Sequence, residues 1–336
     1  GRPLFLILYV NCYRSCVDWL CKNYAAECQS GVDRIIEYHF DPTSGMPLNA
    51  DLNVRNVVFD SYKDYIKIKL AEKKTTNTLF TAFTLRPKLL LELLQSDIDY
   101  SSIINEKQDT MNIMSSILKQ YRNSLNSYGA TAFDQKEIED LLMTIFNKYK
   151  DSIDFSQSDK WNNTIFFRAA RNNFNRLANA ILNLKLPADK IGAKFIDTDY
   201  TTALYWLVNN NQQDLAIQFI DQYCEKNDTM ITSRIGGNAS AMDYAISLRM
   251  GKLLIKMLKL LDSSLPKNNL SALITTLIQS NDETYVLDIL KKLSDDELKS
   301  LNIIDGLSQR NMRDSIQYML VTRKILITSR QVQWNG

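Results

Sequence analysis

The feature that most constrains the fold is a short pattern that returns about every 31 to 38 residues and opens a pair of helices each time. Each copy has a small or polar first residue, two apolar residues three places apart and a polar stop, and an apolar-rich helix follows it. One helix pair of this size cannot bury its own apolar face, so the pairs must stack. The sequence therefore predicts an all-α chain of stacked pairs. The clearest copies are NTLFTAFTLR (77–86), TIFFRAARNN (164–173), TALYWLVNNN (202–211) and SAMDYAISLR (240–249).

The register extends to weaker copies along most of the chain. The first apolar position of each copy is occupied by Leu4, Leu48, Leu79, Ile113, Phe166, Leu204, Met242, Leu273 and Ile304. Seven residues later, where the first helix must end, stand Asn11, Asn173, Asn211 and Asn311. Apart from glycine, asparagine best tolerates the left-handed conformation that ends many helices. We therefore expect the first helix of each pair to end there. Asp51 makes the copy near 48 the weakest, because it replaces the second apolar residue.

Several copies resemble the opening of the ankyrin repeat, a T-P-L-H-x-A run with a period of about 33 residues. The similar segments are RPLFLI (2–7), TIFFRA (164–169), TALYWL (202–207) and SAMDYA (240–245). None contains the full T-P-L-H, and asparagine or arginine mostly replaces the glycine after the first helix. The resemblance implies an ankyrin-like helical-repeat solenoid whose finger loops are 151–161, 193–200 and 230–238. The alternative is an irregular α-solenoid of another kind.

We divide the chain into four parts: divergent repeats at 1–76, middle repeats at 77–161, the best-formed repeats at 162–320 and a tail at 321–336. Residues 25–46 are interpreted as a long connection with a β-like RIIEYHF segment, and 123–135 as an insertion between two helices. The segment 134–150 is predicted to be an amphipathic helix with Ile138, Leu141, Leu142, Ile145 and Phe146 on one face. A solenoid end needs a polar cap, and none precedes the core-type residues that begin at Leu4, so we expect a further region before Gly1.

Composition and charge narrow the class of partner. The net charge is +2, and the densest basic segment, KIKLAEKK (67–74), has the spacing of a solvated helix face, so we expect no nucleic-acid partner. The apolar segment PLFLILYV (3–10) is too short to cross a bilayer. We predict it to be a buried first helix and expect no membrane insertion. Five cysteines without a secretion signal indicate a reducing, intracellular compartment.

The sequence contains little that indicates a catalytic site or a metal site. His39 is the only histidine, which excludes multi-histidine metal sites within this sequence, and the cysteine spacing matches no paired zinc framework. We expect no metal, no small-molecule cofactor and no catalytic residue. Cys12 and Cys16 are expected to fill core space. The alternative function is a cysteine hydrolase in which Cys16 or Cys28 acts with His39.

The register places several polar and aromatic residues along the groove of such an array. The predicted partner-binding residues are Arg168, Arg171, Asn172, Trp206, Asn209 and Asn210 on the first helices, and Trp161, Asp199 and Tyr200 at the finger tips. The alternative for Trp206 is packing against a neighbouring helix.

Arginine and tryptophan anchor interfaces more often than other residues. We therefore expect a scaffold that binds a partner protein. The degenerate copies are similar to ankyrin arrays of effectors secreted by intracellular bacteria, which implies a host eukaryotic protein as partner and the host cytoplasm as location. A further alternative is a targeting module for an enzymatic domain outside this sequence.

Overall fold

The described part of the chain is all-α. The computed structural model describes residues 4–10, 13–40, 52–73, 76–107, 111–126, 133–159, 161–194, 196, 201–232, 239–261, 270–279 and 283–300. Within these residues there is no strand, and Ser158 and Thr164 form an isolated antiparallel bridge. The helices are α1 (Leu4–Val10), α2 (Arg14–Asn23), α3 (Ala25–Phe40), α4 (Leu52–Lys73), α5 (Thr76–Leu85), α6 (Pro87–Gln95), α7 (Ile113–Asn126), α8 (Gln135–Tyr149), α9 (Ile165–Arg171), α10 (Asn175–Asn183), α11 (Ala188–Ile191), α12 (Ala203–Asn209), α13 (Gln213–Tyr223), α14 (Thr229–Thr232), α15 (Ala241–Ser247), α16 (Gly251–Leu260), α17 (Leu270–Gln279), α18 (Glu283–Lys292) and α19 (Asp295–Ser300).

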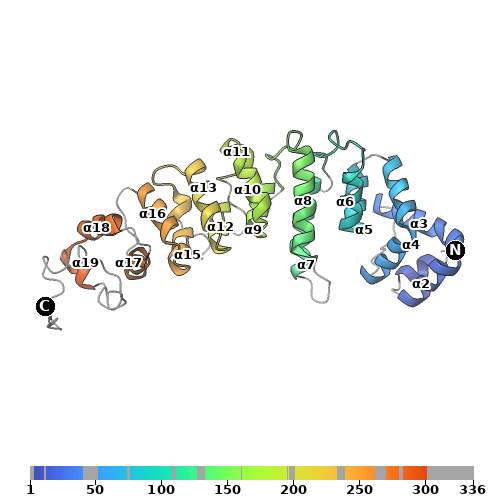
Figure 1. Cartoon of the computed structure of the whole chain (residues 1–336), viewed down its shortest axis with the longest axis horizontal. Coiled ribbons are helices and arrows are strands. Elements are labelled where there is room, and N and C mark those ends of the chain that lie inside the picture. The colour runs from blue at the N-terminus through green and yellow to red at the C-terminus, as the bar shows by residue number, and fades with distance from the viewer. Residues whose placement is uncertain are drawn as a thin grey trace, which may run out of the picture. The chain divides into compact units, whose positions relative to one another are not determined.

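The chain forms two compact units. The N-terminal unit contains residues 1–181 and 189–192, and the C-terminal unit contains residues 182–188 and 193–336. The border falls inside the predicted 162–320 part. Figure 1 shows that in both units consecutive helices turn back on one another as side-by-side pairs.

Helix contacts inside each unit join near neighbours in chain order. In the N-terminal unit α3 packs on α5, α5 on α7 and α7 on α9, while α4 packs on α6 and α6 on α8. In the C-terminal unit α12 packs on α15 and α15 on α17, while α13 packs on α16. In these pairs the first helices therefore contact one another, and so do the second helices. This stacking buries the apolar face that each pair leaves open.

The three best copies of the pattern begin with the same cap. The side-chain oxygens of Thr164, Thr202 and Ser240 accept the backbone N–H three residues ahead, at 3.1–3.2 Å. Such N-caps stabilise a helix by about 1 kcal/mol. Seven-residue helices follow in all three cases, namely α9, α12 and α15.

The same three copies also end alike. Asn173, Asn211 and Arg249 have φ angles of 61°, 59° and 56°, which lie in the left-handed region. The next backbone N–H of each copy donates to a carbonyl in the last turn, at 3.0, 2.8 and 2.9 Å. The prediction that asparagine ends the first helix is confirmed at 173 and 211, whereas Asn11 and Asn311 lie outside the described residues.

Arg249 provides a test of this stop. A long side chain in the left-handed region is strained, so Arg249→Gly is expected to raise the free energy of unfolding by up to about 1 kcal/mol, and Arg249→Val to lower it. Urea unfolding followed by circular dichroism measures both changes. Arg249 is exposed, so few contacts are lost in either variant. An Arg249→Gly chain less stable than the original would contradict the proposed strain.

The predicted amphipathic helix at 134–150 is confirmed as α8. Asp134 caps it by accepting the N–H of Glu137 at 2.8 Å. Ile138, Leu141, Leu142, Ile145 and Phe146, the five residues predicted to share a face, are all buried.

The prediction of a long connection at 25–46 is wrong for residues 25–40, because they form the helix α3. Cys28, Val32, Ile35 and Ile36 are buried from α3, and this spacing matches the helical period. The β-branched and aromatic composition of RIIEYHF suggested a strand, but packing against α1, α2, α4 and α5 fixes a helix. The finger loop expected at 230–238 is also wrong at its start, because residues 230–232 belong to α14.

The prediction of a buried first helix at 3–10 is wrong for one face of α1. Phe5 and Tyr9 are buried, but Leu4 is 63% exposed and Ile7 is 42% exposed. Cys16, expected in the core, is exposed as well, and Cys12 lies outside the described residues.

Candidate functional site

The first helices of the C-terminal unit bring three aromatic side chains together. Tyr205 and Trp206 follow one another in α12, and their rings meet edge to face with centroids 5.2 Å apart. Tyr244 of α15 meets the Tyr205 ring edge to face at 5.4 Å. All three side chains are half-buried, so each keeps part of its surface open. We call Tyr205, Trp206 and Tyr244 the aromatic surface.

Hydrogen bonds hold this surface in one arrangement. The indole Nε1 of Trp206 donates to Oγ1 of Thr201 at 2.8 Å. Burial and a hydrogen bond with Tyr244 raise the pKa of Tyr205 to about 12, so its phenol stays neutral near pH 7. The Tyr205 phenol is therefore neutral, and the Trp206 indole is held by a hydrogen bond within its own unit.

The predicted residues of this unit lie beside the aromatic surface or outside the described chain. The Trp206 ring contacts that of Tyr205 in its own helix, and its indole N–H donates to Thr201. Asn209 is the last residue of α12 and half-buried. Asn210 is the C-cap, and its N–H donates to the Trp206 carbonyl at 2.9 Å. Asp199 and Tyr200 lie outside the described residues.

The prediction that Arg168 faces an open groove is wrong. It occupies the register position of Trp206 in the preceding copy, but it is only 8% exposed and its guanidinium pairs with Asp159. Asp159 Oδ1 also accepts the N–H groups of Trp161 at 2.8 Å and Asn163 at 3.0 Å. The pair therefore joins α9 to the loop before it, and Arg168 is an interior structural residue.

The charges of this pair are set by competing effects. Burial raises the pKa of Asp159, but the N–H donors of Asn163 and Trp161 and the Arg168 charge outweigh it and hold that pKa below its usual value. Burial lowers the pKa of Arg168, and Asp159 partly offsets that change. Both groups are charged near pH 7.

The remaining predicted residues of the N-terminal unit are buried or half-buried. Asn172 is 7% exposed, and its Nδ2 donates to the Leu118 carbonyl at 3.2 Å, so the prediction that it faces an open groove is wrong. Arg171 and Trp161 are half-buried. The ammonium of Lys119 lies 5.7 Å from the centre of the Trp161 ring, which accounts for one face of this indole.

Two members of the aromatic surface, Tyr205 and Tyr244, are absent from the predicted set. Tyr244 stands 38 residues after Trp206, at the same position of the next copy. Applying the register to SAMDYAISLR in the same way would have found it. The sequence gives no comparable signal for Tyr205. Its equivalent in the preceding copy is the apolar Phe167, which is fully buried, so the register indicates a core position there.

The geometry excludes a dyad of Cys28 and His39. Both residues lie in α3, eleven positions apart. A helix rises about 1.5 Å per residue, so their backbones are about 16 Å apart, beyond hydrogen-bond reach. Burial also raises the pKa of the Cys28 thiol, and it raises that of Cys21 to about 11, which disfavours the reactive thiolate. The pairing of Cys16 with His39 depends on a side chain outside the described part of the chain.

Comparison of the chain with family models, with curated proteins and with solved structures gives no match. Among the described residues, no group of three or more histidine, cysteine or carboxylate side chains is placed to hold a metal ion. In the same part of the chain, no helix has the length and apolarity needed to cross a bilayer. The interpretation of function therefore depends on the chain's own residues.

Proposed function

We propose that this chain is a protein-binding scaffold of ankyrin-like repeats that holds a partner protein against the aromatic surface of α12 and α15. The observation that carries the proposal is the trio Tyr205, Trp206 and Tyr244, which is partly open and uncharged. Tryptophan and tyrosine supply a large share of the binding energy at protein interfaces.

The helix pairs support the repeat-scaffold part of the proposal. Three copies spaced 38 residues apart share an N-cap, a seven-residue helix and a left-handed stop. Within each unit, every substantial helix contact joins elements at most three apart in chain order. Stacked helical repeats have this local pattern of contacts, and they present the surfaces of their successive first helices to partners.

The fixed arrangement of the aromatic surface supports its binding role. The Trp206 indole donates to Thr201, and the Tyr205 ring packs edge to face on Trp206 and Tyr244, so these side chains have lost part of their freedom before binding. Ordering a free side chain at an interface costs about 0.5–1.5 kcal/mol, and prior ordering avoids that cost. A small aromatic surface can then contribute useful affinity.

The chemistry favours a protein over a nucleic acid as partner. The net charge is +2, and the aromatic surface contains no lysine, arginine, aspartate or glutamate. A phosphate backbone needs a row of lysine or arginine side chains. The resemblance of the copies to effector arrays makes eukaryotic proteins of a host the first partners to test. From the five cysteines we propose a reducing intracellular location.

Site-specific photo-crosslinking tests the proposal. A benzophenone amino acid at position 244 replaces one aromatic ring with another, and the matched control carries it at Lys252, an exposed residue of the second helix α16. We expect a protein adduct at position 244 that is at least tenfold stronger than at position 252. Trp206→Ala in the position-244 chain should reduce the adduct by a similar factor, because it removes an interface anchor.

Thermal unfolding of each variant checks that the fold is kept. Equal adducts at positions 244 and 252, or an adduct that survives Trp206→Ala in a folded chain, would exclude the aromatic surface as the binding site.

A further inference from the structure

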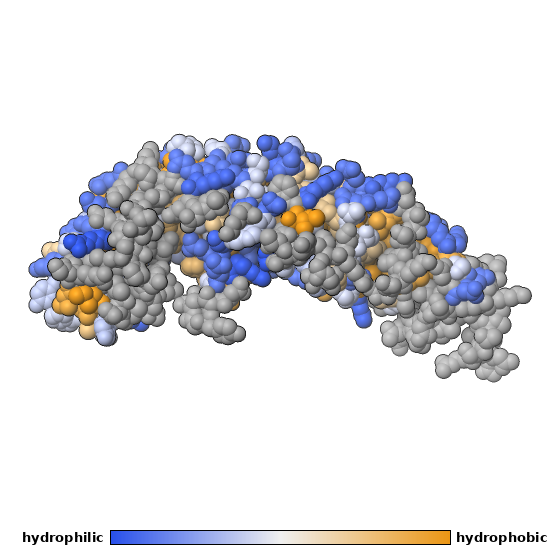
Figure 2. All heavy atoms as spheres, turned by 180° about the vertical axis from the view of Figure 1, so that it is seen from behind, coloured by the Kyte–Doolittle hydropathy of each residue, from blue (hydrophilic) through white to orange (hydrophobic). Residues whose placement is uncertain are grey.

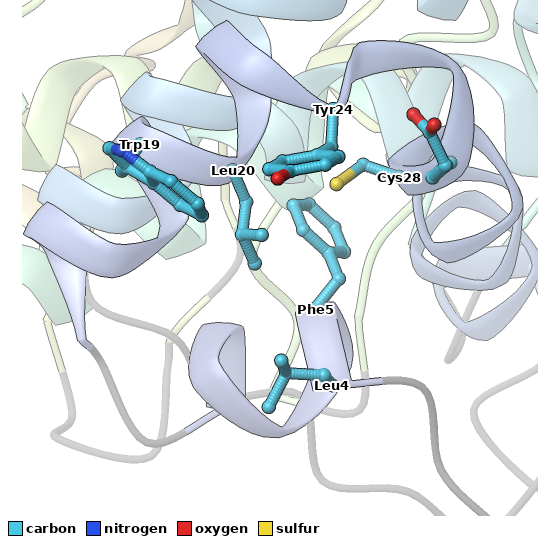
Figure 3. Close-up of a pocket in the computed structure, with 7 residues that line it drawn as sticks. Leu4, Phe5, Trp19, Leu20, Tyr24 and Cys28 are labelled. Atoms are coloured by element: carbon cyan, nitrogen blue, oxygen red, sulfur yellow. The ribbon is translucent and has the colours of Figure 1, made fainter.

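The N-terminal unit contains an apolar pocket that the proposed function does not use. It lies between α1, α2 and α3, has a volume of about 350 Å³ and is lined mainly by Leu4, Phe5, Trp19, Leu20 and Tyr24. Figure 3 shows Leu20, Tyr24, Phe5 and Cys28 pointing toward one another, with Trp19 to one side and Leu4 below. The lining is therefore mainly hydrocarbon and aromatic ring.

The large apolar side chains at the rim of the pocket are unusually exposed to solvent. Leu4 is 63% exposed, Trp19 54% and Tyr24 45%, and the rings of Trp19 and Tyr24 stand 5.3 Å apart. Figure 2 shows an apolar patch on the surface of the N-terminal helices. Contiguous exposed apolar surface of this kind commonly marks an interaction site.

The floor of the pocket is firmly packed. Phe5 and Cys28 are 4% and 3% exposed. A Cβ on Gly31 would lie 2.5 Å from Cδ1 of Phe5, so glycine at this position lets α1 pack directly on α3. A ligand would therefore meet a preformed floor and a more open rim.

One carboxylate lines the pocket. Glu27, in the first turn of α3, is exposed and makes no ion pair with any described residue. A bound apolar group would exclude water beside this carboxylate, and a cation on the ligand would compensate the loss. The pocket thus favours an apolar anchor with a lysine or arginine next to it.

The size of the exposed surface decides between kinds of occupant. An aromatic side chain buries roughly 150–250 Å² when fully covered, so the half-exposed Trp19 and Tyr24, together with Leu4, offer roughly 300 Å². A stable dimer interface needs roughly 800 Å² from each partner. A single short segment fits this surface better than a second copy of the chain.

We infer that the pocket of α1, α2 and α3 binds an amphipathic helix of a partner protein. Large apolar side chains one turn apart enter between Leu4, Trp19 and Tyr24, and a neighbouring lysine or arginine pairs with Glu27. Helices that dock in this way place their anchors at positions i and i+3 or i+4. This site lies in a different unit from the aromatic surface, so either can fail without the other.

A peptide selection tests the inference on the full chain. The probe is a phage-displayed library of 14-residue helical peptides, randomised at two positions one turn apart and at the flanking positions. We expect enrichment of leucine, phenylalanine or methionine at the paired positions and of lysine or arginine beside them. A synthetic peptide of the selected sequence should bind Trp19→Glu at least tenfold more weakly, as measured by fluorescence anisotropy.

Charge reversal tests the role of Glu27. Glu27→Lys should weaken binding of the basic peptide about three- to tenfold and strengthen binding of its lysine-to-glutamate counterpart. The matched control is Ile68→Glu, because Ile68 is 57% exposed on α4 and does not line the pocket. It should bind both peptides as the unchanged chain does.

Several results would overturn the inference. These are selection of the same peptides on Trp19→Glu, acidic flanks in the selected peptides, or no enrichment at all. If light scattering shows that the unchanged chain self-associates and that Trp19→Glu does not, the pocket binds a second copy of the chain. Binding to phosphatidylcholine and phosphatidylserine vesicles that the same variant abolishes would assign it to a lipid surface.

Discussion

Asp159→Ala is expected to lower the free energy of unfolding of the N-terminal unit by about 3–5 kcal/mol, because it leaves the buried Arg168 charge without its partner. Asp159 is 6% exposed, and its carboxylate also accepts the N–H groups of Trp161 and Asn163. The variant therefore loses the ion pair and the hydrogen bonds that shape the loop before α9. Urea unfolding followed by circular dichroism measures the change.

The effect should depend on pH. The pKa of Asp159 is lowered in the folded chain, so its carboxylate contributes stability above the unfolded value of about 3.9. That contribution is lost as the pH falls through the folded pKa. The difference between the original chain and Asp159→Ala should thus be largest near pH 7 and shrink below about pH 4. A difference that grows toward low pH would contradict the assigned charge state.

An exposed pair of the same residue types provides the control. Asp140 pairs with Arg176, and both side chains are about half exposed to water. Water screens this pair, so Asp140→Ala should change stability little. If Asp140→Ala and Asp159→Ala destabilise the chain equally, burial is not the source of the effect.

Phe174→Ala is expected to cost about 3–5 kcal/mol, because it opens a cavity between two successive helix pairs. Phe174 is fully buried between α9 and α10, and its ring meets that of Tyr121 in α7 edge to face, with centroids 4.8 Å apart. Hydrogen exchange measured by mass spectrometry should show faster exchange in both α7 and α9. The physical reason is that each pair depends on the next to cover its apolar face.

Two variants bracket this prediction. Phe174→Leu keeps most of the volume and should cost less, while Leu125→Ala removes a side chain that is 48% exposed at the end of α7 and should change little. Faster exchange confined to α9 in Phe174→Ala would show that the pairs do not support one another.

Local signals in the sequence were enough to predict the helix pairs. The caps Thr164, Thr202 and Ser240 and the stops at Asn173 and Asn211 depend on a few neighbouring residues, and so does the period of α8. Hydrogen bonds between residues three to five positions apart decide where such helices begin and end. The local sequence is therefore enough to predict these features. The helix α3 was missed because its β-branched and aromatic residues fit a strand locally, and contacts with four other helices outweigh that preference.

The sequence by itself determined that this chain is built of helices, where the best-formed ones begin and end, and that its register repeats. Only the tertiary structure decided which repeated positions meet water. Arg168, Trp206 and Tyr244 share one register position, yet Arg168 is buried against Asp159 while the two aromatic residues remain partly open. Leu4 appears equally apolar in the sequence, and it is exposed because nothing packs over that face of α1 in the described chain. Exposure depends on neighbours far away in sequence, and a local pattern carries no information about them.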